Sequence, residues 1–109
     1  MPVQEINEIK DRFVRQLSPK SIYLFGSYAK GTQNEDSDFD FYIIMPDNVG
    51  NQLELTQRAY RSLRGMKRRP VDILLDFDSS FRKRSAENTL ERIVAREGIL
   101  LYGEQSYGQ

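Results

Sequence analysis

The sequence has 109 residues, enough for one modest hydrophobic core, and its 16 basic and 16 acidic residues leave no net charge. Balanced charge provides no overall field that would attract nucleic acid or an anionic membrane. Cysteine and histidine are both absent, which excludes disulfides, thiolate or histidine metal ligands and Ser-His-Asp triads. Any catalysis must therefore use carboxylates, basic side chains, hydroxyl groups or a bound metal ion.

The first third of the chain predicts a helix, a short strand and a tight turn. Apolar residues recur at helical spacing over 3–17, and a proline then ends that helix. A run of strand-forming residues over 21–25 stops at Gly26. Residues 27–30 fit one helical turn closed by Gly31.

The rest of the chain predicts further strands and helices in alternation. In the strand expected over 38–45, Phe39, Phe41 and Ile43 share an apolar face that points to the core. The other expected segments are a helix over about 53–66, a strand over 70–76, a polar linker over 79–85, a helix ending at Gly98, and an edge strand or docked tail over 99–102. This order predicts an α+β fold, a small mixed β-sheet with helices packed on one face and the other face free for a cleft.

We expect a single domain over 1–109, with its core from about 3 to 102 and a frayed tail over 103–109. The N-terminus has no basic start followed by a long apolar run. No stretch approaches the roughly 20 apolar residues of a membrane-spanning helix. These features predict a cytoplasmic protein that does not contact a membrane.

Two elements of the sequence suit phosphate and divalent metal. The turn at Gly26-Ser27 lets backbone N–H groups and a hydroxyl approach phosphate oxygens without a side-chain clash. Asp38 and Asp40 stand two residues apart in the expected strand, so their carboxylates project from one face. Such carboxylates repel each other unless a cation lies between them, and magnesium prefers oxygen ligands and accompanies triphosphates.

Asp72 is a third carboxylate, placed inside an otherwise apolar strand. One such residue is as easily explained by an exposed sheet face, because an acidic side chain there can simply point to solvent. Three of them together with the Gly-Ser turn favour nucleotidyl transfer at a two-metal site. Asp38 and Asp40 would then hold the ion that carries the triphosphate, Asp72 would complete the second site and orient or deprotonate an acceptor hydroxyl, and Ser27 and Lys30 would contact phosphates.

These residues resemble the minimal nucleotidyltransferase (MNT) group of the DNA polymerase β-like nucleotidyltransferase superfamily. The resemblance rests on Gly26-Ser27, Asp38-x-Asp40 and Asp72, and extends to Ala29-Lys30-Gly31 and the ending over 96–102. It implies a nucleotidyltransferase fold, a nucleoside triphosphate donor and magnesium, with two ions expected. The position of Lys30 often carries arginine in the family, so a point charge replaces a two-pronged phosphate contact there.

Small family members commonly act beside a HEPN-domain protein as the antitoxin of a toxin–antitoxin pair, some by transferring AMP to a tyrosine of that partner. The resemblance therefore implies transfer of AMP from ATP to a hydroxyl on a HEPN-domain toxin. Two alternatives stay open: a non-catalytic antitoxin that masks its partner, and nucleotidyl transfer to a small molecule or RNA. The oligomeric state also stays open, and a nucleic-acid acceptor is possible but not favoured.

Several other residues admit two interpretations. The basic side chains of Arg58, Arg61 and Arg64 recur every three residues, which is typical of a solvated helix face or of a docking patch for an acidic partner. Tyr60 lies on the apolar stripe of its expected helix and is expected in the core. Tyr42 shares a face with Asp40, which allows a position near the cleft.

Overall fold

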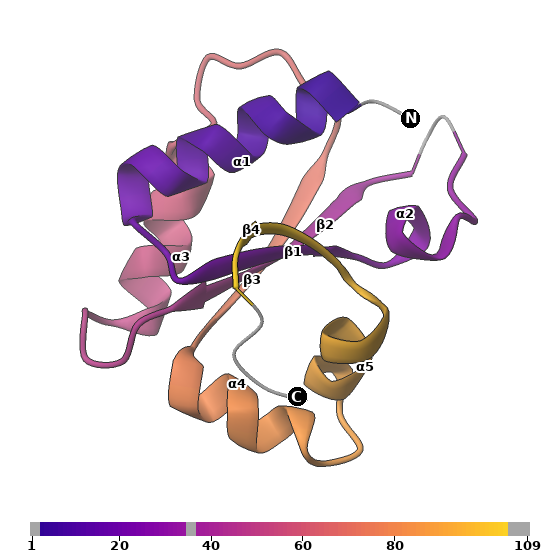
Figure 1. The fold of residues 1–109 in the computed structure, drawn as a ribbon. Coiled ribbons are helices and arrows are strands. Elements are labelled where there is room, and N and C mark those ends of the chain that lie inside the picture. The colour runs from indigo at the N-terminus through magenta and orange to yellow at the C-terminus, as the bar shows by residue number, and fades with distance from the viewer. Residues whose placement is uncertain (1–2, 35–36, 105–109) are drawn as a thin grey trace.

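The computed structural model describes residues 3–34 and 37–104, and Figure 1 shows the arrangement of their helices and strands. Most predicted elements are present with bounds within a few residues of those expected. In chain order the elements are α1 (Val3–Leu17), β1 (Ser21–Phe25), α2 (Ser27–Lys30), β2 (Phe39–Met45), α3 (Gln52–Arg61), β3 (Val71–Phe77), α4 (Asp78–Ser85), α5 (Leu90–Glu97) and β4 (Ile99–Gly103).

The four strands form one mixed sheet in the order β3-β2-β1-β4. β2 and β3 run parallel, whereas β1 is antiparallel to both β2 and β4. The prediction of an α+β fold with a small mixed sheet is therefore confirmed. The segment over 99–102 is an edge strand, the first of the two alternatives. Of the predicted tail over 103–109, the structure describes two residues. Gly103 belongs to β4, and the Ser21 hydroxyl donates to the Glu104 carbonyl at 3.2 Å. Residues 105–109 lie outside the described chain.

One face of the sheet is covered by α1 and α3 (Figure 1). Phe13 of α1 is fully buried and meets Phe41 of β2 edge to face, with ring centroids 5.3 Å apart. Phe39, Phe41 and Ile43 all point into this core, as their alternation predicts. The side chain of Asn51 caps the start of α3 by accepting the Glu54 backbone N–H at 3.1 Å.

The opposite face is partly covered as well, so the prediction that helices pack on one face only is wrong. α4 and α5 bury Phe81 and Val94 against Tyr23, Tyr42 and Ile44. The linker predicted from the polar and basic residues over 79–85 is instead part of the helix α4, and Phe81 is the single large apolar residue in this segment. The Phe81 ring anchors α4. It stacks on the Tyr23 ring with centroids 6.3 Å apart and meets the Tyr42 ring edge to face with centroids 5.1 Å apart.

In the described part of the chain, no helix combines the length and the apolar character needed to cross a lipid bilayer.

The small second core predicts that Phe81→Ala destabilises the protein by about 3–5 kcal/mol, because the substitution leaves a cavity under α4. Urea unfolding followed by circular dichroism measures this loss. Lys83→Ala, an exposed change on the same helix, is the matched control and should alter stability by less than about 0.5 kcal/mol. Equal effects of the two substitutions would show that α4 does not depend on Phe81.

Candidate active site

The topology brings the predicted site segments to one end of the sheet. β1 is antiparallel to β2, so its last residue, Phe25, pairs with Asp40 near the start of β2. β3 is parallel to β2, so Asp72 near its start pairs with the same Asp40. The turn that follows β1 and the carboxylates that open β2 and β3 therefore meet at a single edge.

Gly26 packs directly against the Asp40 carboxylate. Its φ of 72° lies in the region that favours glycine, and a Cβ built there would overlap Asp40 Oδ2 and come within 3.0 Å of Asp40 Cγ. Gly31, which ends α2, has a similar φ of 75° but no heavy atom within 4 Å of an added Cβ. Gly26 is therefore required both by its backbone conformation and by its contact with Asp40.

Asp40 is the carboxylate whose ionisation is most disturbed at this edge. Its pKa is raised from 3.8 to about 6, first by burial, then by the charges of Asp72 and Asp38, and by a hydrogen bond with the Asp72 side chain. Asp72 is exposed. Asp38 is exposed too and lies just before β2, which begins one residue later than predicted. Asp40 and Asp72 thus form a close pair, and Asp38 adds charge from the preceding segment.

This group of carboxylates matches the donor chemistry of a hard divalent cation. Within residues 3–34 and 37–104, no three acidic, histidine or cysteine side chains are already gathered around one point. Oxygen donors nevertheless suit magnesium, and the repulsion that raises the pKa of Asp40 is the kind that a cation relieves. The chemistry of these residues therefore fits such a cation.

The predicted phosphate-binding residues Gly26, Ser27 and Lys30 lie in the turn that follows β1. Ser27 is half-buried at the start of the four-residue helix α2, and Lys30 is exposed at its end. Two backbone bonds close this turn: the Lys30 N–H donates to the Gly26 carbonyl at 3.1 Å, and the Thr32 N–H donates to the Ser27 carbonyl at 3.0 Å. Ser27 directly follows Gly26, which packs against Asp40, and the phosphate-binding roles of Ser27 and Lys30 stay predictions.

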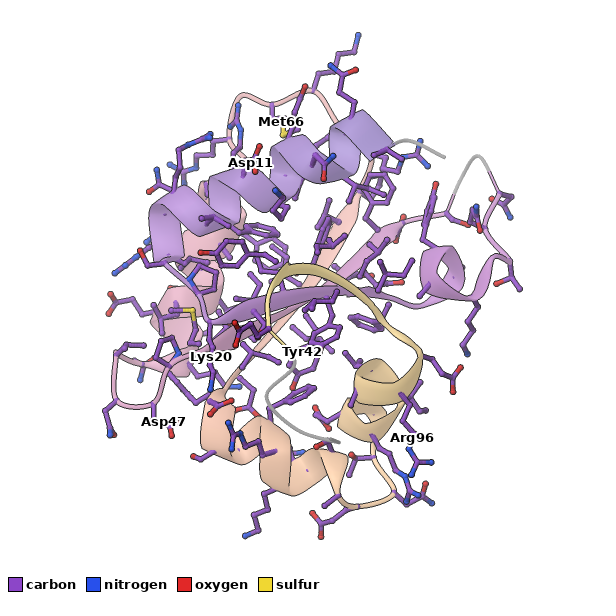
Figure 2. All side chains as sticks on the ribbon, in the orientation of Figure 1. Asp11, Lys20, Tyr42, Asp47, Met66 and Arg96 are labelled. Atoms are coloured by element: carbon purple, nitrogen blue, oxygen red, sulfur yellow. The ribbon has the colours of Figure 1, made fainter. Side chains whose placement is uncertain are left out.

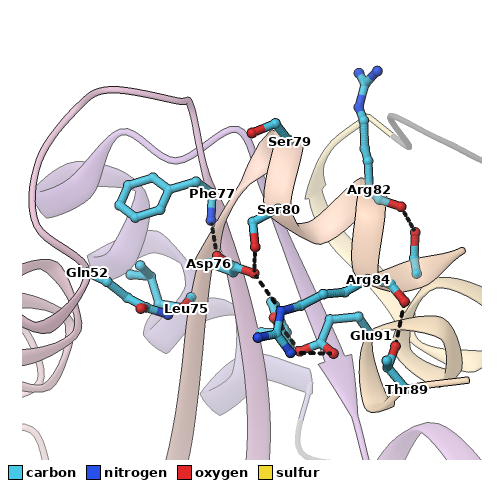
Figure 3. A network of polar contacts seen from close by, with 12 residues as sticks. Gln52, Leu75, Asp76, Phe77, Ser79, Ser80, Arg82, Arg84, Thr89 and Glu91 are labelled. Atoms are coloured by element: carbon cyan, nitrogen blue, oxygen red, sulfur yellow. Dashed lines mark hydrogen bonds and ion pairs between the residues drawn. The ribbon is translucent and has the colours of Figure 1, made fainter. Parts of the chain in front are cut away.

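A buried polar network on the same sheet face was not anticipated from the sequence. Asp76, only 8% exposed, accepts hydrogen bonds from the Ser80 hydroxyl and the Phe77 N–H, both at 2.8 Å (Figure 3). Arg84 lies between two acids, 4.0 Å from Asp76 and 3.9 Å from Glu91. Asp76 stands four residues after Asp72 in the same apolar strand, and this period-two spacing was the available signal.

Tyr42, labelled in Figure 2, belongs to this network and is not free in the cleft. It is 2% exposed, and its hydroxyl donates to Glu91 Oε2 at 2.8 Å. Burial, followed by the bond and charge of Glu91, raises the pKa of Tyr42 above its usual range. Tyr42 and Leu74 pair one step along the sheet from Asp40 and Asp72, and both line a cavity of about 270 Å³.

Tyr60 is not in the core, since it is 41% exposed and its hydroxyl oxygen accepts the Ile73 N–H at 3.0 Å.

Arg58 pairs with Glu54 at 3.2 Å, and α3 ends at Arg61, so Arg64 lies beyond the helix. A docking patch at these arginines stays a prediction.

Comparison with known proteins decides the family. A model of the nucleotidyltransferase domain matches residues 6–100. The chain belongs to this nucleotidyltransferase family. It is 36% identical to the protein adenylyltransferase MntA of Shewanella oneidensis, with 94% of this chain and 70% of MntA covered.

Solved structures agree with this assignment to the nucleotidyltransferase family. A toxin–antitoxin structure with AMP-PNP is 32% identical, with a TM-score of 0.56 over 90% of this chain and 73% of the other. A complex of tri-AMPylated Shewanella oneidensis HEPN toxin with MNT antitoxin is 27% identical, with a TM-score of 0.57 over 96% of this chain and 75% of the other. The nucleotidyltransferase fold expected from the Gly-Ser turn and the three aspartates is therefore confirmed.

The contact between Gly26 and Asp40 predicts a difference between two glycine substitutions. Gly31→Ala places a Cβ in the left-handed helical region (φ 75°, ψ 17°), which costs about 1 kcal/mol, whereas Gly26→Ala places one at φ 72° and ψ −148°, a region almost restricted to glycine. Only Gly26→Ala also forces the Asp40 carboxylate away, so it should lower the free energy of unfolding by about 1–3 kcal/mol more. Chemical denaturation of both variants measures the difference, and equal losses would contradict the close packing.

The raised pKa of Asp40 predicts how stability depends on pH in metal-free protein. Below about pH 4 the carboxyl is protonated in both the folded and unfolded states. Between about pH 4 and 6 the folded state binds the proton more tightly than the unfolded state does. Protonation of Asp40 therefore stabilises the fold at low pH, and this contribution to the free energy of unfolding is lost as pH rises through the folded-state pKa of about 6. Asp40→Asn should remove the loss, becoming more stable than wild type by on the order of 1–2 kcal/mol at pH 7.

The measurement is the difference in unfolding free energy between Asp40→Asn and wild type, taken from pH 4 to 7 in EDTA. The difference isolates Asp40 because other titrating groups are common to both proteins. A difference that does not change with pH would show that Asp40 is not held in a repulsive, buried position.

Proposed function

We propose that this chain is a magnesium-dependent protein adenylyltransferase that transfers AMP from ATP to a hydroxyl of a HEPN-domain toxin in the cytoplasm and acts as its antitoxin. The observation that carries the proposal is the meeting of the Gly26-Ser27 turn with the Asp40–Asp72 pair at one sheet edge. The relative MntA, a protein adenylyltransferase, and the complex that contains an AMPylated HEPN toxin support the choice of donor and acceptor.

The turn is assigned to the triphosphate. Gly26 has no side chain, so its backbone allows close approach of phosphate oxygens, and the Ser27 hydroxyl donates a hydrogen bond to one of them. The exposed ammonium group of Lys30 offsets phosphate charge from the end of α2. These residues orient the donor so that its α-phosphorus faces the carboxylates.

We assign the three carboxylates to metal binding and to removal of a proton from the acceptor. Asp38, Asp40 and Asp72 would hold magnesium, two ions in this proposal, which supplies neutralisation of the triphosphate charge in such reactions. The acceptor oxygen forms a bond to the α-phosphorus, the bond to the β-phosphate oxygen breaks, and pyrophosphate leaves. Asp72, exposed at the edge strand, orients the acceptor hydroxyl and takes its proton.

A masking role is the second candidate, and exposed apolar side chains near the end of the chain favour it. α5 and β4 carry large apolar side chains that are each between 37% and 43% exposed: Leu90, Ile93, Ile99, Leu100 and Tyr102. Exposed apolar side chains of this kind suit contact with another protein. Masking alone would need this contact but no transferred nucleotide, so the two functions differ in whether the partner gains covalent AMP.

Replacing both Asp38 and Asp40 by Asn should abolish transfer, because the neutral side chains remove the charge that binds the metal and donor. Transfer is measured by incubating a purified HEPN-domain toxin with the chain, ATP and magnesium, and weighing the toxin by mass spectrometry. Circular dichroism should show that the double variant keeps its fold, since relief of carboxylate repulsion does not destabilise it.

Controls without ATP or without magnesium should leave the toxin unmodified. Full transfer by the double variant would refute the proposed site. If the wild-type protein inhibits the toxin without adding AMP to it, the masking function would be supported and the adenylyltransferase function would be wrong.

A further inference from the structure

Arg69 makes a concentrated set of contacts beside the candidate active site. It lies in the segment before β3, three residues ahead of Asp72. Its guanidinium lies over two aromatic rings, 4.6 Å from the centroid of Phe39 and 5.6 Å from that of Tyr28. One guanidinium nitrogen also donates a hydrogen bond to the Tyr28 hydroxyl.

The two rings belong to the segments that carry the site. Tyr28 directly follows Ser27, and Phe39 stands between Asp38 and Asp40. The rings touch each other edge to face, with centroids 4.8 Å apart. Through these contacts Arg69 links the Gly-Ser turn, the start of β2 and the entry to β3, which together hold every predicted site residue except Lys30.

Backbone and ionic bonds fix Arg69 itself. Its N–H donates to Glu5 Oε2 at 3.0 Å, and its Nε lies 3.6 Å from Glu5 Oε1, so both oxygens of one α1 carboxylate face it. The next residue, Pro70, accepts the Phe39 N–H at 3.2 Å, which starts the pairing of β2 with β3. The Arg69 side chain is 26% exposed, so these contacts are partly shielded from water.

We propose that Arg69 is a positioning residue that holds Ser27, Asp40 and Asp72 in the relative arrangement that nucleotidyl transfer requires. The inference rests on the proposed function. Arg69 acts on these residues through Tyr28, Phe39 and the entry to β3. A planar guanidinium is needed because it stacks on a ring and donates from its edge at the same time, which a lysine ammonium cannot do.

The sequence conceals this role. Arg69 ends a stretch with six basic residues between Leu55 and Val71, and such a stretch reads as a solvated surface. Its neighbours Lys67 and Arg64 are indeed exposed, whereas Arg69 is turned onto the rings. The aromatic residues that it contacts lie about 30 and 40 positions earlier, so no local pattern connects them.

The test compares Arg69→Ala, Arg69→Lys and Tyr28→Phe with Arg15→Ala, which removes an exposed arginine from α1. Two readouts are needed: the affinity for AMP-PNP with magnesium, and kcat and KM for AMP transfer from ATP to the HEPN-domain toxin. All are measured well below the melting temperature of each variant. A residue that only stabilises the fold would lower that temperature and leave these constants unchanged.

Arg69→Ala should lower kcat/KM by about 10- to 100-fold, because displacements near 1 Å at such sites have effects of this size. Arg69→Lys should recover only part of this loss, and Arg15→Ala should match wild type. Tyr28→Phe, which keeps the ring and removes the hydrogen-bond acceptor, should cause a smaller loss that is not additive with Arg69→Ala.

The outcomes separate the inference from the function beneath it. Transfer by wild-type protein with unchanged constants in Arg69→Ala would overturn the positioning role alone. If Arg69→Ala fails to fold, Arg69→Lys and Tyr28→Phe decide, and wild-type kinetics in both would overturn it. Absence of transfer by wild-type protein would overturn the proposed function, and the inference with it.

Discussion

The close approach of Asp40 to Asp72 is the constraint on which the rest of this structure depends. Burial of Asp40 disfavours its charged form, and the charge of Asp72, its partner across the parallel strand pair, adds to the cost, so the pKa of Asp40 is raised. The protein tolerates this cost at the end of the sheet where the Asp40 carboxylate occupies the space that Gly26 leaves open by lacking a Cβ. An unfavourable local arrangement that the surrounding structure holds in place is typical of a functional site.

Packing on both faces of the sheet keeps that pair in place. The core under α1 and α3 locks the apolar face of β2, so its alternate residues must project Asp40 to the opposite side. On that side α4 and α5 cover Tyr42 and Ile44 but leave the sheet edge at Asp72 open. Under the proposed function, this surface would bind the donor, and another molecule would supply the acceptor.

Much of this arrangement could be predicted because it follows from local patterns. Strand alternation separates Phe39 and Phe41 from Asp40, and an isolated acid in an apolar strand marks Asp72. Other features depend on long-range packing: α4 is held by the single ring of Phe81, and Asp76 is buried among partners on α4. Arg69 was missed for the same reason, since its charge in a basic run carries no sign of the rings that it covers.

A crystal structure with AMP-PNP and manganese, located by its anomalous scattering, tests the central claim most directly. Manganese is the appropriate probe because it takes the same oxygen ligands as magnesium. The account predicts manganese between Asp40 and Asp72, with the phosphates against Gly26 and Ser27. Metal and nucleotide bound elsewhere, for example in the cavity beside Asp76 and Arg84, would contradict it.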